Sequence, residues 1–172
     1  MSIPRIFATL GFFFVLFIVQ ESVVSLIHFP IAGFSLYLAI AIALIALEDK
    51  DGAIVMGFLG GIVLDLSPTS NAPFGQWALI LTIVGYAVAA NKESIADLTL
   101  SPLTFVLFVA FAVSVALLAY LAFGTLLGEG NGSFRRDIVI VCANAVWTII
   151  FTPIFLPALR NFRRASLTSR ER

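Results

Sequence analysis

Residues 102–127 read PLTFVLFVAFAVSVALLAYLAFGTLL and contain no charged side chain. A helix needs about 20 consecutive apolar residues to cross the hydrocarbon core of a bilayer, so this run is long enough to span one. Its start carries helix signals as well, because Ser101 is a typical N-cap residue and Pro102 suits the first helical position. The run therefore predicts a membrane-spanning helix that begins at Pro102.

The whole chain shares this apolar character. Of its 172 residues, 60% are apolar and 12% are charged, whereas a soluble domain has about 45–50% apolar and about 25% charged residues. This composition excludes a soluble enzyme, a nucleic-acid-binding protein and a disordered chain. The length leaves room for a single polytopic membrane domain, residues 1–172, and for no second, soluble domain.

Six apolar segments are separated by short polar or proline-containing stretches. Backbone groups inside a bilayer must find hydrogen-bond partners within the protein, and the segments do not alternate as barrel strands do, so we expect helices. The predicted fold class is an all-α integral membrane protein with six transmembrane helices. The expected helices cover about residues 6–27, 31–47, 52–66, 74–90, 102–127 and 137–159. Pro153 and Pro157 are expected to kink the last helix.

Lysine and arginine are distributed unequally between the two sides of this arrangement. Six spans put both termini on one side, together with eight of the ten basic residues, and leave only Arg135 and Arg136 on the other. By the positive-inside rule, both termini are cytoplasmic. Residues 160–172 hold five arginines and form a basic cytoplasmic tail. This tail is a topology determinant or, alternatively, a contact for anionic lipid or a cytoplasmic partner.

The third expected helix carries a stripe of small residues. Ala53, Gly57 and Gly61 are spaced four apart and share one face, Asp65 follows four residues later, and Gly60 widens the face. Small residues allow helices to approach closely in membranes. We expect the stripe to mediate helix packing within the bundle, and the alternative is a docking face for a helix of another protein.

The fourth expected helix has a matching seam, and the first helix does not. Gly75, Ala78 and Gly85 belong to a run of small residues at alternating spacings of three and four, a spacing similar to that of a coiled-coil seam. The first helix instead carries phenylalanines, including Phe7 and Phe13, on every side. These bulky side chains favour exposure to lipid or to a partner.

Glu21, Asp65 and Asn144 are polar residues within the expected spans. Polar groups in a bilayer are costly, so each is a candidate functional position. The topology places Glu21, Asp65 and Asn144 in the outer half of the membrane, on the first, third and sixth helices. We expect them to form one polar region open to the outer side, with Asp65→Ala weakening partner function more than folding. The structural alternatives are an outer-interface glutamate for Glu21 and, for Asp65, an interfacial residue or a cap for the loop at residues 67–73. For Asn144, together with Thr148 and Thr152 on the same face, the alternative is inter-helix hydrogen bonding.

The motifs of common catalytic and metal sites are absent from the sequence. There is one cysteine and one histidine, so an internal disulfide and a Cys/His metal cluster are excluded. The chain contains no Walker loop, no HExxH and no Gly-x-Ser-x-Gly motif, and Asp65 is not preceded by the Gly-x-Gly pattern of intramembrane aspartyl proteases. We therefore expect a non-enzymatic protein with no catalytic residue, no cofactor and no metal.

Residues 57–66, GFLGGIVLDL, followed by residues 73–79, PFGQWAL, resemble the bacterial rod shape-determining protein MreD family. The pattern of that family is a glycine-rich helix ending in aspartate, a short loop, and a small-residue helix that opens with an apolar residue and glycine. Length, six spans and the basic tail are also similar, whereas the loop at residues 67–72 matches no fixed pattern. The resemblance implies a fold similar to the substrate-binding subunits of ECF vitamin transporters.

The resemblance also implies a function. It suggests a non-enzymatic plasma-membrane subunit of the bacterial cell-elongation (rod) complex, which helps to maintain cell shape and organise lateral peptidoglycan synthesis. The implied partners are an MreC-like membrane protein and, through it, MreB-like filaments and the RodA/penicillin-binding-protein synthase, with the lipid bilayer and no nucleic acid. The alternative is a substrate-binding membrane subunit of an ECF-type small-molecule transporter, although the first helix lacks the Ala-x-x-x-Ala stripe expected for coupling.

Overall fold

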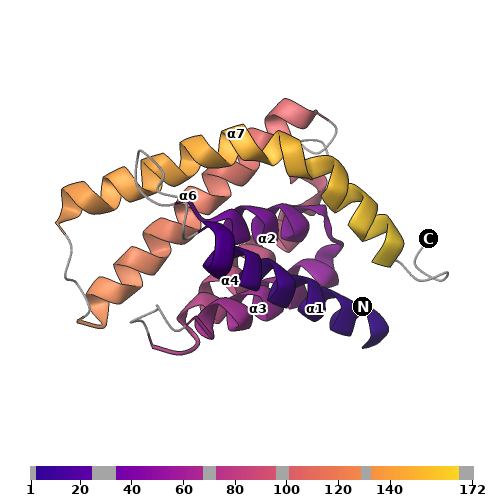
Figure 1. Ribbon diagram of the computed structural model, residues 1–172, viewed down its shortest axis with the longest axis horizontal. Coiled ribbons are helices and arrows are strands. Elements are labelled where there is room, and N and C mark those ends of the chain that lie inside the picture. The colour runs from indigo at the N-terminus through magenta and orange to yellow at the C-terminus, as the bar shows by residue number, and fades with distance from the viewer. Residues whose placement is uncertain (1–2, 25–33, 68–72, 96–100, 129–132, 167–172) are drawn as a thin grey trace.

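The computed structural model describes residues 3–24, 34–67, 73–95, 101–128 and 133–166. The regular elements in these ranges are helical (Figure 1). They are α1 (Ile3–Val19), the π-helical turn η1 (Gln20–Val24), α2 (Leu36–Leu47), α3 (Lys50–Asp65), α4 (Gln76–Ala90), α6 (Pro102–Leu126) and α7 (Phe134–Ser166), with a short helical turn at residues 92–95. The predicted all-α fold is confirmed for these residues.

α2 lies at the centre of the molecule. Its sequence, LYLAIAIALIAL, is apolar all round, which is typical of a helix buried on every side. Residues 37–46 are all buried, and α2 contacts α1, α3, α4, α6 and α7. With 12 residues it is about 18 Å long, shorter than the expected segment 31–47. It begins late because the Ser35 side chain accepts the Leu38 N–H as an N-cap, and residues 31–33 lie outside the described ranges.

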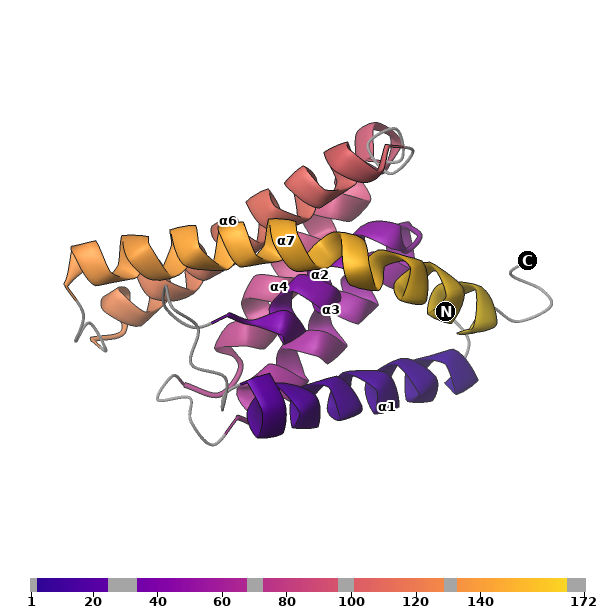
Figure 2. The ribbon, with the colours of Figure 1, turned by 45° about the horizontal axis from the view of Figure 1, so that its top comes forward.

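Two helical hairpins enclose α2. α3 packs against α4 and α6 packs against α7, while α1 runs along α3 (Figure 2). The expected start of the fifth segment is confirmed, since Ser101 is the N-cap and Pro102 occupies the first turn of α6. α7 bends in its second half, which contains Pro153 and Pro157 (Figure 1).

The boundaries of the last and first expected helices need correction. The last helix begins at Phe134 rather than at residue 137, and it continues to Ser166, beyond the expected end at residue 159, because no glycine or further proline interrupts the residues after Pro157. The basic tail at residues 160–172 therefore begins as helix. The first helix changes to π-helical geometry at Gln20, where the sequence shows a polar interruption, and residues 25–27 lie outside the described ranges.

Three of the described helices are long and apolar enough to cross a membrane: Arg5–Ser22, Pro102–Leu126 and Arg135–Phe162. α2 and α4 are apolar but shorter. The fold is thus helical and compatible with a membrane, and the count of six spans remains a prediction.

Candidate functional site

α3 and α4 contact each other backbone to backbone along the predicted small-residue stripe. A Cβ on Gly61 would lie 2.5 Å from the Trp77 carbonyl oxygen, one on Gly85 would lie 2.5 Å from the Ala53 carbonyl oxygen, and one on Gly57 would overlap the α4 backbone. The two helices are antiparallel, so that contacts spaced four residues apart on α3 meet contacts spaced four residues apart on α4 in the reverse order. The stripe is therefore filled by α4, which leaves no room there for the helix of another protein.

Gly60 faces a different neighbour from the other glycines of α3. A Cβ at this position would lie 3.3 Å from the Phe13 ring, and the Gly60 carbonyl accepts a hydrogen bond of 2.7 Å from the Tyr37 hydroxyl. Gly60 thus joins α3 to α1 and α2. The expectation that the phenylalanines of α1 are exposed holds for Phe7 but is wrong for Phe13, which is fully buried at this contact.

Asp65 caps the helix that follows it in the chain. Its two carboxylate oxygens accept hydrogen bonds from the N–H groups of Trp77 and Ala78, each at 2.9 Å. The N-cap residue of α4 is Gly75, with a φ of 101° and no side chain to bond the first turn. Negative charge is also favoured at a helix N-terminus. Asp65 therefore supplies from α3 the cap that α4 lacks, while most of the loop before α4 lies outside the described residues.

The start of α4 is also tied to α6, through residues that the sequence analysis did not identify. The Gln76 Nε2 group donates a hydrogen bond of 2.8 Å to the Tyr120 carbonyl. The Trp77 ring stacks on the Tyr120 ring at 4.4 Å between centroids. A glutamine in the first turn of an otherwise apolar helix is the signal that could have indicated this contact.

Amide side chains from two other helices hold the N-terminus of α2. The Asn144 Oδ1 atom of α7 accepts the Ser35 N–H at 2.9 Å. Gln20 of η1 donates to the Phe34 carbonyl at 3.3 Å and accepts the Tyr37 N–H at 3.2 Å. Inter-helix hydrogen bonding is therefore confirmed for Asn144, whereas the Thr152 hydroxyl donates to the Thr148 carbonyl within α7. Gln20 is a further residue at this end that was not among the predicted site residues.

Glu21 lies beside the end of α3. Its Oε1 atom accepts a hydrogen bond of 3.4 Å from the Ser67 hydroxyl, two residues after Asp65. Glu21 follows Gln20, which bonds the same α2 terminus as Asn144. The structure thus brings Glu21, Asp65 and Asn144 to one end of the bundle, which we call the Asp65 end. Their hydrogen bonds join helix termini and neighbouring side chains.

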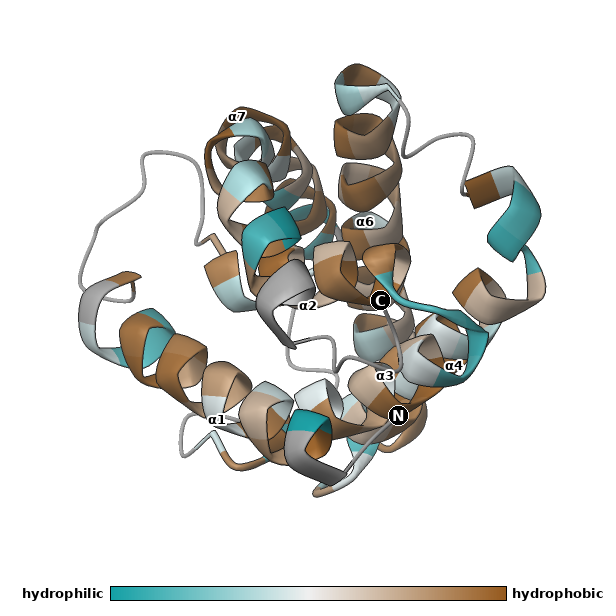
Figure 3. Ribbon diagram, turned by 90° about the vertical axis from the view of Figure 1, so that its right-hand side faces the viewer, coloured by the Kyte–Doolittle hydropathy of each residue, from teal (hydrophilic) through white to brown (hydrophobic). Residues whose placement is uncertain are grey.

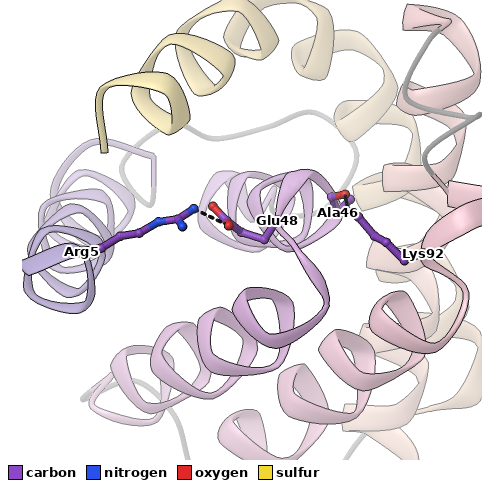
Figure 4. A network of polar contacts seen from close by, with 4 residues as sticks. All are labelled: Arg5, Ala46, Glu48 and Lys92. Carbon is purple, nitrogen blue, oxygen red and sulfur yellow. Dashed lines mark hydrogen bonds and ion pairs between the residues drawn. The ribbon is translucent and has the colours of Figure 1, made fainter. Parts of the chain in front are cut away.

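The opposite end of α2, which we call the Arg5 end, carries charges. Arg5 of α1 forms an ion pair of 2.5 Å with Glu48, and both side chains are buried, at 3% and 1% exposure. Lys92 donates a hydrogen bond of 2.8 Å to the Ala46 carbonyl (Figure 4). Cations are favoured at helix C-termini, where carbonyl groups lack partners within the helix.

In the sequence, Arg5 and Lys92 belong to the eight basic residues on the side of the termini, and Glu48 directly follows the second apolar segment. The available signal was a carboxylate directly after a helix that is apolar on every side. Such a group is carried into the interior with the helix and requires a nearby cation, because an isolated buried charge is very costly.

Both ends of α2 therefore use side chains to join helices.

Among the described residues, no group of three or more His, Cys, Asp or Glu side chains is placed to hold a metal ion. Comparison of the chain with protein-family models, with curated proteins and with solved structures finds no match.

Proposed function

We propose that this chain is a non-enzymatic scaffold subunit of the bacterial cell-elongation complex, similar to MreD, in the plasma membrane. The observation that carries the proposal is the α3–α4 junction, which is made by the same residues, 57–66 and 73–79, that resemble the family. Gly57 and Gly61 admit the α4 backbone, and Asp65 caps α4. The resemblance thus rests on residues that act together as one structural unit, rather than on apolar composition.

The proposed topology has six helices and cytoplasmic termini. The start of α1 and the end of α7 lie on the same side of the molecule (Figures 1 and 2), which supports an even number of crossings. Large apolar side chains are exposed on the long helices, including Phe7 at 69%, Phe111 at 68% and Ile154 at 70%, and hydrophobic residues colour α6 and much of α1 in Figure 3. These surfaces suit contact with lipid.

The short length of α2 is compatible with this topology. A membrane helix needs internal partners for its backbone groups, and at α2 those partners are supplied by Gln20 and Asn144 at one end and Lys92 at the other. The surrounding helices shield α2 from lipid. A central helix of about 18 Å therefore fits inside a bilayer core of about 30 Å.

Fusions of reporter proteins test the topology. Green fluorescent protein attached after Arg172 should fluoresce, and alkaline phosphatase at the same point should be inactive, because the C-terminus is cytoplasmic. Alkaline phosphatase inserted at residues 129–132 should be active. Active phosphatase at the C-terminus would contradict the proposal.

Affinity purification tests the function. The tagged chain, co-expressed with the MreC-like protein of the same bacterium, should recover that protein, and depletion of the chain should turn rods into spheres. The Gly61→Leu variant should neither recover the MreC-like protein nor restore the rod shape of depleted cells, because the substitution separates α3 from α4. The Gly124→Leu variant, at a position with no neighbour within 4 Å, should do both. Folded protein that recovers no MreC-like partner and whose depletion leaves cells rod-shaped would contradict the proposal.

The transporter alternative has less support. A substrate site at the outer side would draw on Glu21, Asp65 and Asn144, and these residues bond Ser67, the start of α4 and the start of α2. Recovery of a pair of ATPase subunits instead of an MreC-like protein in the same purification would favour this alternative.

A further inference from the structure

α6 and α7 form a groove on the side of the molecule where they separate. The two helices pack against each other and diverge toward the start of α6 and the end of α7 (Figures 1 and 2). The space between them is a groove of about 720 Å³. This volume lies within the range of roughly 300–1,000 Å³ that is common for small-molecule sites.

The lining of the groove is apolar along its length and polar at one end. Leu103 and Val106 of α6 face Ile149, Pro153 and Leu156 of α7. Proline within a helix removes a backbone hydrogen bond and bends the chain, and the bend of α7 lies in the half that contains Pro153. The proline positions therefore help to keep this half of α7 away from α6.

Arg160 and Asn161 form the polar end of the groove. Arg160 is partly exposed, and Asn161 is exposed. A guanidinium group binds phosphate oxygens in a two-pronged geometry, and an amide can donate further hydrogen bonds to them. Arg163 and Arg164 follow within the next turn of α7, so the end of this helix has a positive charge that attracts anionic headgroups.

The length of the groove distinguishes between possible occupants. From Ile149 to Arg160 the helix rises by about 16 Å at 1.5 Å per residue. This is about half of the 30 Å hydrocarbon core, which corresponds to one leaflet. A membrane-spanning helix of a partner would need a surface about twice as long, whereas a phospholipid has an apolar chain of one-leaflet depth and a charged end.

We propose that this groove binds one anionic phospholipid of the cytoplasmic leaflet. An acyl chain lies against Leu103, Val106 and Ile149, and the headgroup phosphate is bound by Arg160 and Asn161. The site would hold a structural lipid between α6 and α7. The proposal depends on the membrane placement of the chain and is independent of its role in the elongation complex.

Native mass spectrometry of the purified full chain tests the proposal. Titration in detergent with phosphatidylglycerol should show a first binding event about fivefold tighter than with phosphatidylethanolamine, the difference expected for one basic residue near a headgroup. Arg160→Gln should remove this preference. Leu103→Trp should weaken the first binding event for both lipids by about fivefold or more, because the indole ring fills the groove.

Two matched variants serve as controls. Arg135→Gln removes an exposed arginine at the opposite end of α7, and Leu107→Trp adds a ring one turn further along α6, where Leu107 is 50% exposed and does not line the groove. Both should bind phosphatidylglycerol as the unmodified chain does. Leu103 is 68% exposed, so its replacement should leave the helical circular dichroism spectrum unchanged.

Several results would overturn the proposal. One is that phosphatidylglycerol and phosphatidylethanolamine bind the unmodified chain with equal affinity in the first binding event. Another is that Arg160→Gln and Arg135→Gln reduce the preference for phosphatidylglycerol equally, and a third is that Leu103→Trp binds both lipids as tightly as the unmodified chain. A photo-crosslinking amino acid at position 103 gives a further test in cells, where an adduct with the mass of a phospholipid supports the site and an adduct with a protein overturns it. Because the titration uses the isolated chain, its outcome is distinguishable from failure to recover an MreC-like partner.

Discussion

At its N-terminus α2 is held by neutral amide groups, whereas at its C-terminus it is held by charged groups. Gln20 and Asn144 bond the backbone at the Asp65 end, while the buried Arg5–Glu48 pair and Lys92 lie at the Arg5 end. Both arrangements solve the same problem, because the terminal N–H and C=O groups of a helix have no partner within it.

The difference between the two ends lies in what remains when one partner is lost. Removal of an amide leaves a neutral backbone group with one hydrogen bond fewer, at a cost of about 1 kcal/mol. Removal of one member of a buried ion pair leaves an uncompensated charge, at a cost of about 3–5 kcal/mol. We therefore expect the Arg5 end to be the more sensitive of the two.

The largest effect should come from Glu48→Ala. This change leaves Arg5 buried without its carboxylate and should lower the free energy of unfolding by about 3–5 kcal/mol. Titration with sodium dodecyl sulfate in mixed micelles, followed by circular dichroism, measures this free energy.

The double variant Arg5→Met, Glu48→Met is the control for the Glu48 experiment. Replacing both members of a buried pair by apolar residues is often neutral or stabilising, so the double variant should recover most of the loss. A double variant as unstable as Glu48→Ala would show that the pair itself does not explain the effect.

The next effect concerns the contact that places Asp65 on α4. Gly61→Leu inserts a side chain where a Cβ already lies 2.5 Å from the Trp77 carbonyl oxygen, and overpacking of this kind costs about 1–3 kcal/mol. The same unfolding assay measures the loss. Gly124→Leu has no neighbour within 4 Å and should stay close to the unmodified chain, so equal losses in the two variants would contradict the proposed close contact.

A smaller loss is expected for Asp65→Ala at the same end. Loss of a helix cap costs about 0.5–2 kcal/mol, and α4 has no side-chain cap of its own because Gly75 occupies that position. This result would replace our sequence-based expectation that the substitution affects partner function more than folding. Asp51→Ala, at an exposed position in the first turn of α3, should change the unfolding free energy by less than about 0.5 kcal/mol. Similar values for the two aspartates would show that capping is unimportant.

The smallest effect should come from Asn144→Leu, which tests the N-terminus of α2, where neutral amide groups bond the backbone. The change removes the acceptor of the Ser35 N–H and should cost about 1 kcal/mol. Thr148→Val is the matched control one turn further along α7, because the buried Thr148 hydroxyl has no hydrogen-bond partner among the described residues. This control should be neutral or slightly stabilising, and a loss equal to that of Asn144→Leu would indicate packing rather than hydrogen bonding.

Part of this architecture follows directly from the sequence. The uncharged run after Ser101 determined where α6 begins, since capping and proline chemistry act within a few residues. The spacing of Gly57 and Gly61 predicted a close helix contact, because residues four apart share one face. Asp65 and Asn144 were identified as candidates, since polar groups in apolar segments are costly without partners.

The tertiary structure alone decided which groups become partners. Asp65 caps α4 because the glycine contact sets the register of two antiparallel helices, and Arg5 meets Glu48 across 43 positions of chain. The local sequence pattern contains no information on such pairings. The spacing of residues along a helix shows which of them share a face, but not which other helix covers that face. The shortness of α2 has the same origin, since its ends depend on side chains that other helices bring to them.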